Sequence, residues 1–230
     1  MTSENPNDKP KLGVLAEILA SHGVDLNKIR AEAEPYTDHT MTPAETAEWN
    51  RERAGQYFQK HTPAMFRHAY ATHPAVLDWV ERYLLDPAVA GSLALLGTTG
   101  TGKTYQAYGA LAAIGNSGRS PIGWVARSVP DLFARLRPSS GINTDTEYET
   151  VANAKLLLLD DLGAANQTDW TEEITFRLID RRYANCLPTI ITTNLPLPKL
   201  RGMLGDRVSS RLRQMCAMVT IEGDDRRRAA

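Results

Sequence analysis

A glycine-rich stretch at residues 97–104 carries the residue types that bind a polyphosphate. Its eight residues, GTTGTGKT, satisfy the pattern G-x-x-x-x-G-K-[ST] at every specified position. Glycines let successive backbone N–H groups point into one concavity, the lysine reaches the outer phosphates, and the threonine hydroxyl ligates Mg²⁺. We therefore predict a nucleoside triphosphate site formed by Gly97, Thr98, Thr99, Gly100, Thr101, Gly102, Lys103, Thr104 and Tyr105.

Two acidic residues are the second candidate for a role in catalysis or metal binding. Asp160 and Asp161 directly follow four leucines at 156–159, a run that is typical of a buried strand. Ligands of open α/β sheets bind at the carboxyl ends of the strands. We assign Asp160, with Thr104, to a Mg²⁺ ion that bridges the phosphates, and Asp161 to orienting or deprotonating the attacking water. The alternative is that the two acids only cap the exposed end of the strand.

Asn194 follows a third predicted buried strand, at residues 189–193. A complete strand predicted at 122–126 separates the loop strand from the acidic strand, which leaves room for the 189–193 strand between them. Asn194 at its tip can then hydrogen-bond the attacking water or the γ-phosphate. An Asx turn before Pro196 explains the same residues equally well.

Arginines near the carboxyl end are candidates for electrostatic catalysis. Arg207 and Arg211 are spaced i, i+4 in a predicted short helix, so they lie on one face. An arginine aimed at a γ-phosphate is a strong catalyst, and in a ring of subunits Arg211 would reach the neighbouring site. The alternative is an ion pair with Asp206 or a nearby acid. Arg226 either folds back over its own nucleotide or belongs to a basic tail.

The elements that must position these groups alternate along the chain. Strands are predicted at residues 93–96, 122–126, 156–159, 189–193 and 218–221. Helices are predicted from 42 to about 60, from 74 to about 86, after residue 103, from 128 to 136, from 170 to 184 and from 208 to 212, with a polar loop at 137–148. This order predicts an α/β fold in which a parallel five-stranded sheet lies between helices.

Composition narrows the class of protein. The chain has 230 residues, a net charge of −1 and 42% hydrophobic residues, which suits one large α/β domain or a smaller one with an N-terminal piece. The net charge argues against a histone-like DNA binder. No apolar run or N-terminal segment resembles a membrane span or secretory signal, and two distant cysteines suit a reducing cytoplasm.

The first 74 residues carry no chemical motif. Two apolar stripes at 12–35 predict a pair of short helices that either dock on the main domain or bind a partner. We therefore divide the chain into a small helical N-terminal region, 1–74, and a nucleotide-binding domain, 75–230.

The segments GTTGTGKT, LLLLDDLG, IITTN and DRVSSRL, in this order, resemble those of the AAA+ ATPases. More narrowly, residues 75–228 are similar to the group of DnaC-type helicase loaders and IstB-type transposition helpers. The resemblance implies a Walker A loop at 97–104, a Walker B pair at Asp160–Asp161, sensor 1 at Asn194, an arginine finger acting in trans at Arg211 and sensor 2 at Arg226. Many AAA+ proteins have glutamate where Asp161 stands, so we expect slow turnover, and the loose match of the tail leaves Arg226 or Arg227 open.

This resemblance implies an ATP- and Mg²⁺-dependent ATPase that loads or remodels a replicative helicase on single-stranded DNA. It also implies assembly into a ring or spiral, in the cytoplasm of a bacterial or phage-infected cell. Few residues follow Arg211, so we expect no helical C-terminal lid domain, which also fits this group. The alternatives are a transposition helper, a nucleotide-gated DNA-binding module with little hydrolysis, or a small-molecule kinase. The kinase has least support, because no acceptor pocket or base for one is evident.

Overall fold

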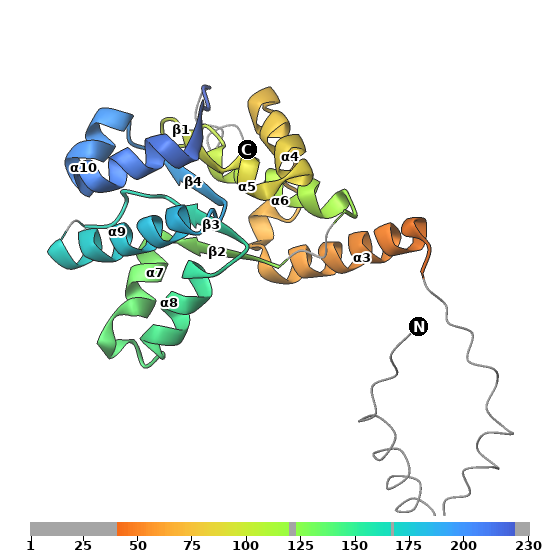
Figure 1. Ribbon diagram of the computed structural model, residues 1–230. Coiled ribbons are helices and arrows are strands. Elements are labelled where there is room, and N and C mark those ends of the chain that lie inside the picture. Colours follow the sequence, from red (N-terminus) through yellow and green to blue (C-terminus); the bar gives the residue numbers. More distant parts are fainter. Residues whose placement is uncertain (1–40, 120–122, 167, 224–230) are drawn as a thin grey trace, which may run out of the picture. The chain divides into compact units, whose positions relative to one another are not determined.

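The structure, a computed structural model, describes residues 41–119, 123–166 and 168–223 (Figure 1). The described residues from Thr42 onward belong to one compact unit. The helices predicted at 12–35 and the sensor 2 position predicted at Arg226 or Arg227 lie outside the described residues.

A five-stranded parallel sheet forms the centre of this unit. Its strands are β1 Ser92–Leu96, β2 Trp124–Ser128, β3 Leu156–Asp160, β4 Thr189–Thr193 and β5 Cys216–Thr220. They lie in the order β2-β3-β4-β1-β5, and every neighbouring pair is parallel. The predicted sheet and the predicted place of β4, between β1 and β3, are confirmed. All five carboxyl ends therefore meet at one edge of the sheet.

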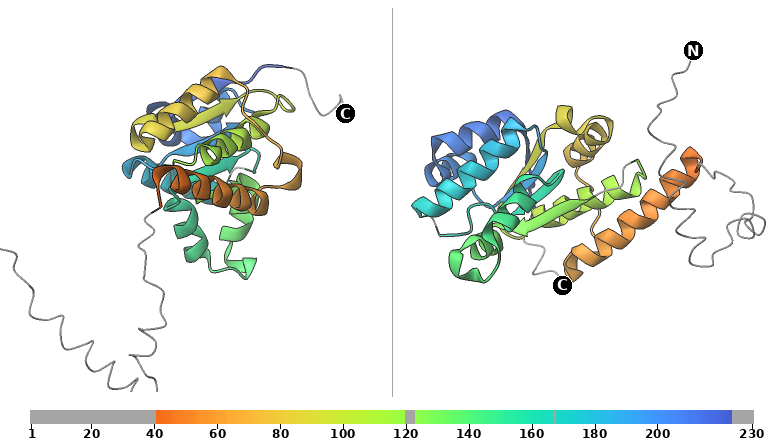
Figure 2. Two further views of the ribbon diagram at one scale, coloured as in Figure 1. Left: turned by 90° about the vertical axis from the view of Figure 1, so that its right-hand side faces the viewer. Right: turned by 60° about the horizontal axis from the view of Figure 1, so that its bottom comes forward.

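Helices cover both faces of the sheet (Figures 1 and 2). The helical elements are α3 Pro43–His61, η1 Ala64–Phe66, α4 Pro74–Leu85, α5 Pro87–Ala90, α6 Lys103–Asn116, α7 Val129–Leu136, η2 Pro138–Ser140, α8 Thr144–Ala152, α9 Asp169–Ala184 and α10 Leu197–Met215. In β3, Leu156 and Leu158 pack into the core under α3, α4 and α6, whereas Leu157 and Leu159 pack into the core under α7 to α10. Successive side chains of a strand point to opposite faces, so the leucine run contributes to both cores.

Helix α3 packs against the main body of the domain. Thr42 and Glu45 form the predicted capping box at its start. The Asn50 side chain donates to the Gly118 carbonyl at 2.9 Å, and the Tyr57 hydroxyl donates to the Trp124 carbonyl at 2.7 Å. The boundary that we predicted at 74/75 thus falls inside the compact unit.

Several sequence predictions need correction. Strand β2 lies at 124–128 instead of 122–126, because Arg127 and Ser128 continue the parallel register with β3. The stretch at 137–148 is not a loop throughout: it contains η2 and the start of α8. Helix α8 carries little apolar signal, but the Asn143 side chain caps it and the Arg127–Glu147 ion pair, at 2.6 Å, ties it to β2.

The helix predicted at 208–212 is part of the longer α10. This helix runs from Leu197 to Met215, but Gly205 breaks the helical conformation with φ 76° and ψ 167°. Leu200 and Leu204, before this break, are buried in the same core as Val208 and Leu212 after it. The last strand consequently begins at Cys216, two residues earlier than the predicted 218.

A buried arginine closes the amino end of the sheet. Arg182 of α9 is fully buried, and burial lowers the pKa of its guanidinium to about 10. Its N–H groups donate to four carbonyl oxygens and one hydroxyl, those of Val151, Ala152, Ala154, Pro188 and Thr189. One side chain thereby joins α9 to the end of α8 and to the chain entering β3 and β4.

We expect Arg182→Met to lower the free energy of unfolding by about 3 kcal/mol or more, because several buried carbonyls would lose their donors. Urea unfolding of the full chain measures this loss. Arg181→Met is the matched control, since the Arg181 guanidinium pairs with Glu149 at the exposed surface and should contribute much less. Equal losses in the two variants would contradict the role given to Arg182.

Candidate nucleotide-binding site

The phosphate loop, residues 97–104, connects β1 to α6 and uses glycine where other residues would clash. Gly97 has φ +154°, and a Cβ atom there would lie 2.3 Å from the Ile221 carbonyl oxygen. Gly102 precedes α6 in a left-handed conformation, with φ 95° and ψ 16°. These backbone angles suit glycine and bring the loop directly onto the amino end of α6, where the helix dipole favours an anion.

Lys103 lies folded along this loop and is 6% exposed. Its Nζ donates to the Thr98 carbonyl at 2.7 Å, and the Thr101 hydroxyl donates to the same oxygen at 3.1 Å. The ammonium group is therefore held among the loop residues, in the place from which it can contact phosphate oxygens.

The segment before α4 keeps α6 in position. The Gln106 side chain accepts hydrogen bonds from the backbone N–H groups of Thr72 and His73, at 2.9 and 3.2 Å. A Cβ atom at Gly109 would lie 2.3 Å from the Ala71 nitrogen, so this segment crosses directly over the helix. Tyr105 also reaches it, since its hydroxyl donates to the His68 carbonyl at 3.1 Å.

Asp160 joins the phosphate loop to the sheet. Its Oδ1 accepts from the Thr104 hydroxyl at 2.8 Å and from the Thr192 hydroxyl at 2.7 Å. Burial raises the pKa of the Asp160 carboxyl, and these two hydrogen bonds act against that rise. The structure thus brings the two predicted Mg²⁺ ligands, Thr104 and Asp160, into direct contact.

Asp161 and Asn194 also meet at this edge. The Asn194 amide donates to the Asp161 carboxylate at 2.8 Å. Asp161 has a left-handed backbone, φ 65°, which turns the chain at the end of β3. The Leu195 N–H donates to the Thr193 hydroxyl at 3.1 Å, so the turn after β4 uses the threonine side chain.

Thr192 is a site residue that the sequence analysis did not select. It lies in a strand that we predicted to be buried. The only feature of the sequence that could have pointed to it is the presence of a polar residue in the run IITT. Its hydroxyl contacts Asp160 and also accepts from the Asp161 N–H at 2.9 Å.

Arg211 lies on α10, where it packs against α9 of its own chain. Its Nε donates to Asp180 at 2.8 Å, and its guanidinium lies 4.6 Å from the centre of the Tyr183 ring. The acid that pairs with it is therefore Asp180, while Asp206 pairs with Arg201. These partners hold the guanidinium at the α9–α10 interface, whereas Lys103, Thr104 and the two acids gather at the carboxyl edge of the sheet.

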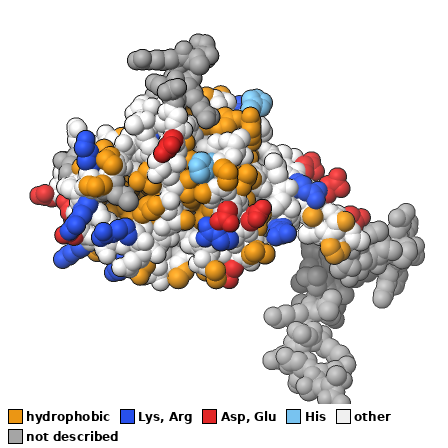
Figure 3. Space-filling model, turned by 90° about the horizontal axis from the view of Figure 1, so that it is seen from above, with side chains coloured by type: hydrophobic (Ala, Val, Ile, Leu, Met, Phe, Trp, Pro, Cys, Tyr) orange, Lys and Arg blue, Asp and Glu red, His pale blue; other side chains and the backbone are white. Residues whose placement is uncertain are grey.

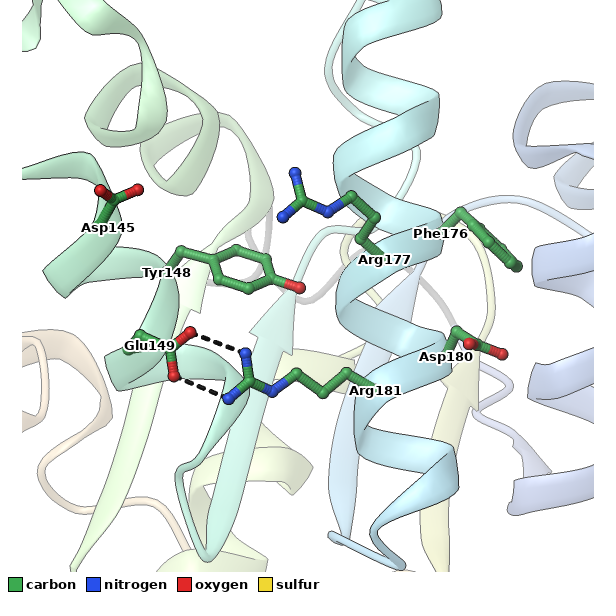
Figure 4. Close-up of a pocket in the computed structure, with 7 residues that line it drawn as sticks. All are labelled: Asp145, Tyr148, Glu149, Phe176, Arg177, Asp180 and Arg181. Atoms are coloured by element: carbon green, nitrogen blue, oxygen red, sulfur yellow. Dashed lines mark hydrogen bonds and ion pairs between the residues drawn. The ribbon is translucent and has the colours of Figure 1, made fainter.

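A separate cleft of about 420 Å³ lies between α8 and α9. Figure 4 shows Arg177 and Arg181 projecting from α9 toward Tyr148, and Asp180 projecting from α9 away from α8. Arg181 binds Glu149 through two hydrogen bonds of 2.7 Å, and Arg177 lies over the Tyr148 ring. All of its lining residues come from α8 and α9, so this cleft is distinct from the phosphate loop.

The residues at the sheet edge fit a Mg²⁺–nucleotide. A glycine cradle, one ammonium, one hydroxyl and one carboxylate supply what a P-loop site supplies. The described residues contain no cluster of three or more His, Cys, Asp or Glu that could hold a metal unaided. A Mg²⁺ ion there would take its other ligands from phosphate oxygens and water, as is usual for this ion.

No helix within the described ranges is long and apolar enough to cross a membrane.

The fold and this site together define a P-loop nucleotide-binding protein of the AAA+ type. The chain belongs to the family described as IstB-like ATP binding protein, whose sequence profile matches residues 74–230. The crystal structure of the DnaC helicase loader is similar, with a TM-score of 0.60, 28% identity, and coverage of 70% of this chain and 100% of that chain.

Two curated relatives are helicase loaders. Replicative helicase loader DnaC of Escherichia coli (strain K12) is 28% identical over 124 residues, covering 51% of this chain and 48% of its own. Replicative helicase loader DnaI of Bacillus subtilis (strain 168) is 26% identical over 179 residues, covering 71% and 54%. The chain spans about half the length of these relatives.

Proposed function

We propose that this protein is an ATPase that loads or remodels a replicative helicase on single-stranded DNA. The observation that carries the ATPase proposal is the hydrogen-bonded path from Thr104 through Asp160 and Thr192 to Asp161 and Asn194. This path joins the phosphate loop to two acids. Asp160 is suited to binding a metal ion, and Asp161 is suited to orienting the attacking water. The loader proposal is supported by the similarity to the helicase loaders DnaC and DnaI.

Each residue has a separate task in this proposal. The loop N–H groups and Lys103 bind the phosphates, and Thr104 with Asp160 holds Mg²⁺. The bound Mg²⁺ would offset charge on the β- and γ-phosphate oxygens. Asp161 orients the attacking water or accepts its proton, while the Asn194 amide keeps the Asp161 carboxylate directed at the sheet edge. Asp161 is one methylene shorter than the glutamate that many AAA+ proteins have at this position, so its carboxylate reaches less far toward the water. This supports slow turnover.

We assign Arg211 as an arginine finger that acts on the nucleotide of the next subunit in a ring or spiral. Its side chain is partly exposed, with 37% of its surface accessible. To act in trans, it must leave Asp180 and the Tyr183 ring, so assembly and the loss of this ion pair would be coupled. Arg226, or Arg227, remains our proposal for sensor 2.

Residues 1–74, or the part of them that precedes α3, are proposed to contact the helicase, and residues 75–230 to form the ATPase domain. On the face seen in Figure 3, Lys and Arg side chains are interspersed with acidic and apolar ones. This mixture supports modest DNA affinity that improves when ATP orders an assembly. The relatives come from bacteria, which supports the cytoplasm of a bacterial or phage-infected cell.

The family description favours a second candidate, an IstB-like transposition helper ATPase. A nucleotide-gated DNA-binding module with little hydrolysis is the third, and it is supported by the short acid Asp161 and its bond to Asn194. The three proposals share the nucleotide site and differ in partner and turnover.

We expect Asp161→Asn to bind Mg²⁺–ATP normally and to lose hydrolysis by about 10²-fold or more, because an amide cannot accept the proton of water. Asp160→Asn should instead weaken the Mg²⁺ dependence of nucleotide binding. Phosphate release and the binding of a fluorescent ATP analogue measure the two effects. Hydrolysis at the native rate by Asp161→Asn would show that the roles are wrongly assigned.

We expect Arg211→Ala to bind ATP normally and to hydrolyse it about 10³-fold more slowly. Mixing it with Asp160→Asn protein should restore part of the activity, because some interfaces then join an intact acid to an intact arginine. If Arg211 served its own subunit, no subunit in the mixture would hold both groups. A flat mixing curve, with co-assembly verified separately, would reject the trans arrangement.

We expect the full chain with ATP to deposit the replicative helicase of its host on circular single-stranded DNA. Lys103→Ala is the control, since it lacks the ammonium that binds phosphate and should deposit none. Helicase retained on the DNA after gel filtration is the measurement. Binding and stimulation of a transposase, with no binding of the helicase, would replace the loader by the transposition helper.

A further inference from the structure

Thr192 contacts three successive residues at the end of β3. It is 1% exposed, and it lies in β4, between β1 and β3. Its hydroxyl donates to Asp160 Oδ1 at 2.7 Å and accepts from the Asp161 N–H at 2.9 Å. Its carbonyl oxygen accepts from the Leu162 N–H at 2.8 Å. A hydroxyl has one proton to donate, so the bond to Asp160 uses it fully.

The orientation of the Asp160 carboxylate depends on donors from two elements. Thr104 donates to Oδ1 from the first turn of α6, and Thr192 donates to the same oxygen from the centre of the sheet. The sheet donor is the more enclosed of the two threonines, because Thr192 is 1% exposed whereas Thr104 is only half-buried. A partly buried carboxylate that loses one of these donors has fewer contacts to fix its orientation and is more costly to keep charged.

The same hydroxyl also sets the backbone of Asp161. The N–H bond to Thr192 holds the left-handed turn at Asp161, φ 65°, that directs its carboxylate to Asn194. One side chain therefore relates the positions of both acids to each other and to the sheet.

We propose that Thr192 is a positioning residue for the metal–nucleotide site, which acts by orienting Asp160 and anchoring the peptide of Asp161. This inference rests on the proposed function, in which Asp160 holds Mg²⁺. Groups that orient metal ligands through hydrogen bonds commonly change metal affinity by about 10- to 100-fold when removed.

Thr193 is the matched control in the same strand. It is also 1% exposed, and its hydroxyl donates to the Leu162 carbonyl at 2.7 Å and accepts from the Leu195 N–H. Both of these partners are backbone groups, and neither is a carboxylate. Thr193→Val thus removes a buried threonine hydroxyl from β4 without removing a donor to Asp160.

The test is the binding of a fluorescent, non-hydrolysable ATP analogue to the full chain over a series of Mg²⁺ concentrations and in EDTA. We expect Thr192→Val to raise the half-saturating Mg²⁺ concentration by about tenfold or more and to leave binding in EDTA unchanged. Thr192→Ser, which keeps the hydroxyl, should recover the native Mg²⁺ dependence to within about threefold. Thr193→Val should retain it.

An unchanged Mg²⁺ dependence in Thr192→Val, or an equal change in Thr193→Val, would overturn the proposal. If Thr192→Val lacks a cooperative unfolding transition, Thr192→Ala and Thr192→Ser are compared instead, because they differ only in the hydroxyl. Equal Mg²⁺ dependence in that pair would overturn it as well. Failure of the proposed function is separately visible, since the native chain would then bind the analogue equally with and without Mg²⁺.

Discussion

The partly buried carboxylate of Asp160 governs the arrangement of the site. An acid that is partly withdrawn from water needs hydrogen-bond donors, and here they come from α6 on one side and β4 on the other. Both donors are available only because β4 lies between β1 and β3, so that the ends of three parallel strands meet around one point. The strand order therefore serves the site as well as the packing of the sheet, because it brings both hydroxyl donors to Asp160.

The two edges of the sheet differ in how fully their charged side chains are hydrogen-bonded. At the amino edge, Arg182 is surrounded by carbonyl and hydroxyl acceptors, which satisfy its N–H groups and join α8 and α9 to the strands. At the carboxyl edge, Asp160, Asp161 and Asn194 are held by few bonds and lie beside a loop rich in N–H groups. The first edge is suited to stability, and the second to binding a charged ligand.

The interface of α9 with α10 connects this site to the rest of the proposed mechanism. Arg211 is held by Asp180 and Tyr183, and Arg207 lies over Phe176, so α9 supplies the partners of both arginines. If Arg211 acts between subunits, it must exchange these partners for a phosphate of the neighbour. An isolated subunit would then have no neighbour to supply the arginine, so hydrolysis would depend on assembly.

Several elements were out of reach of sequence analysis for identifiable reasons. Helix α8 has a cap and an ion pair but little apolar periodicity, so its polar residues predicted a loop. Helix α10 is interrupted at Gly205, which hid its first half. Thr192 was counted as part of a buried strand, because a hydroxyl inside a sheet reveals its partner only when the neighbouring strand is known.

The sequence by itself determined the chemistry and the class: the phosphate loop, the paired acids, the five-stranded parallel sheet and the resemblance to the family whose profile the chain matches. These depend on residue type, short spacing and hydrophobic pattern, all of which are local. The tertiary structure alone decided the partners, since Thr104–Asp160, Asp161–Asn194 and Arg211–Asp180 join residues that are 56, 33 and 31 positions apart. Such contacts depend on how side chains from distant segments pack at the sheet edge and between helices, which the predicted strand order and local patterns do not specify.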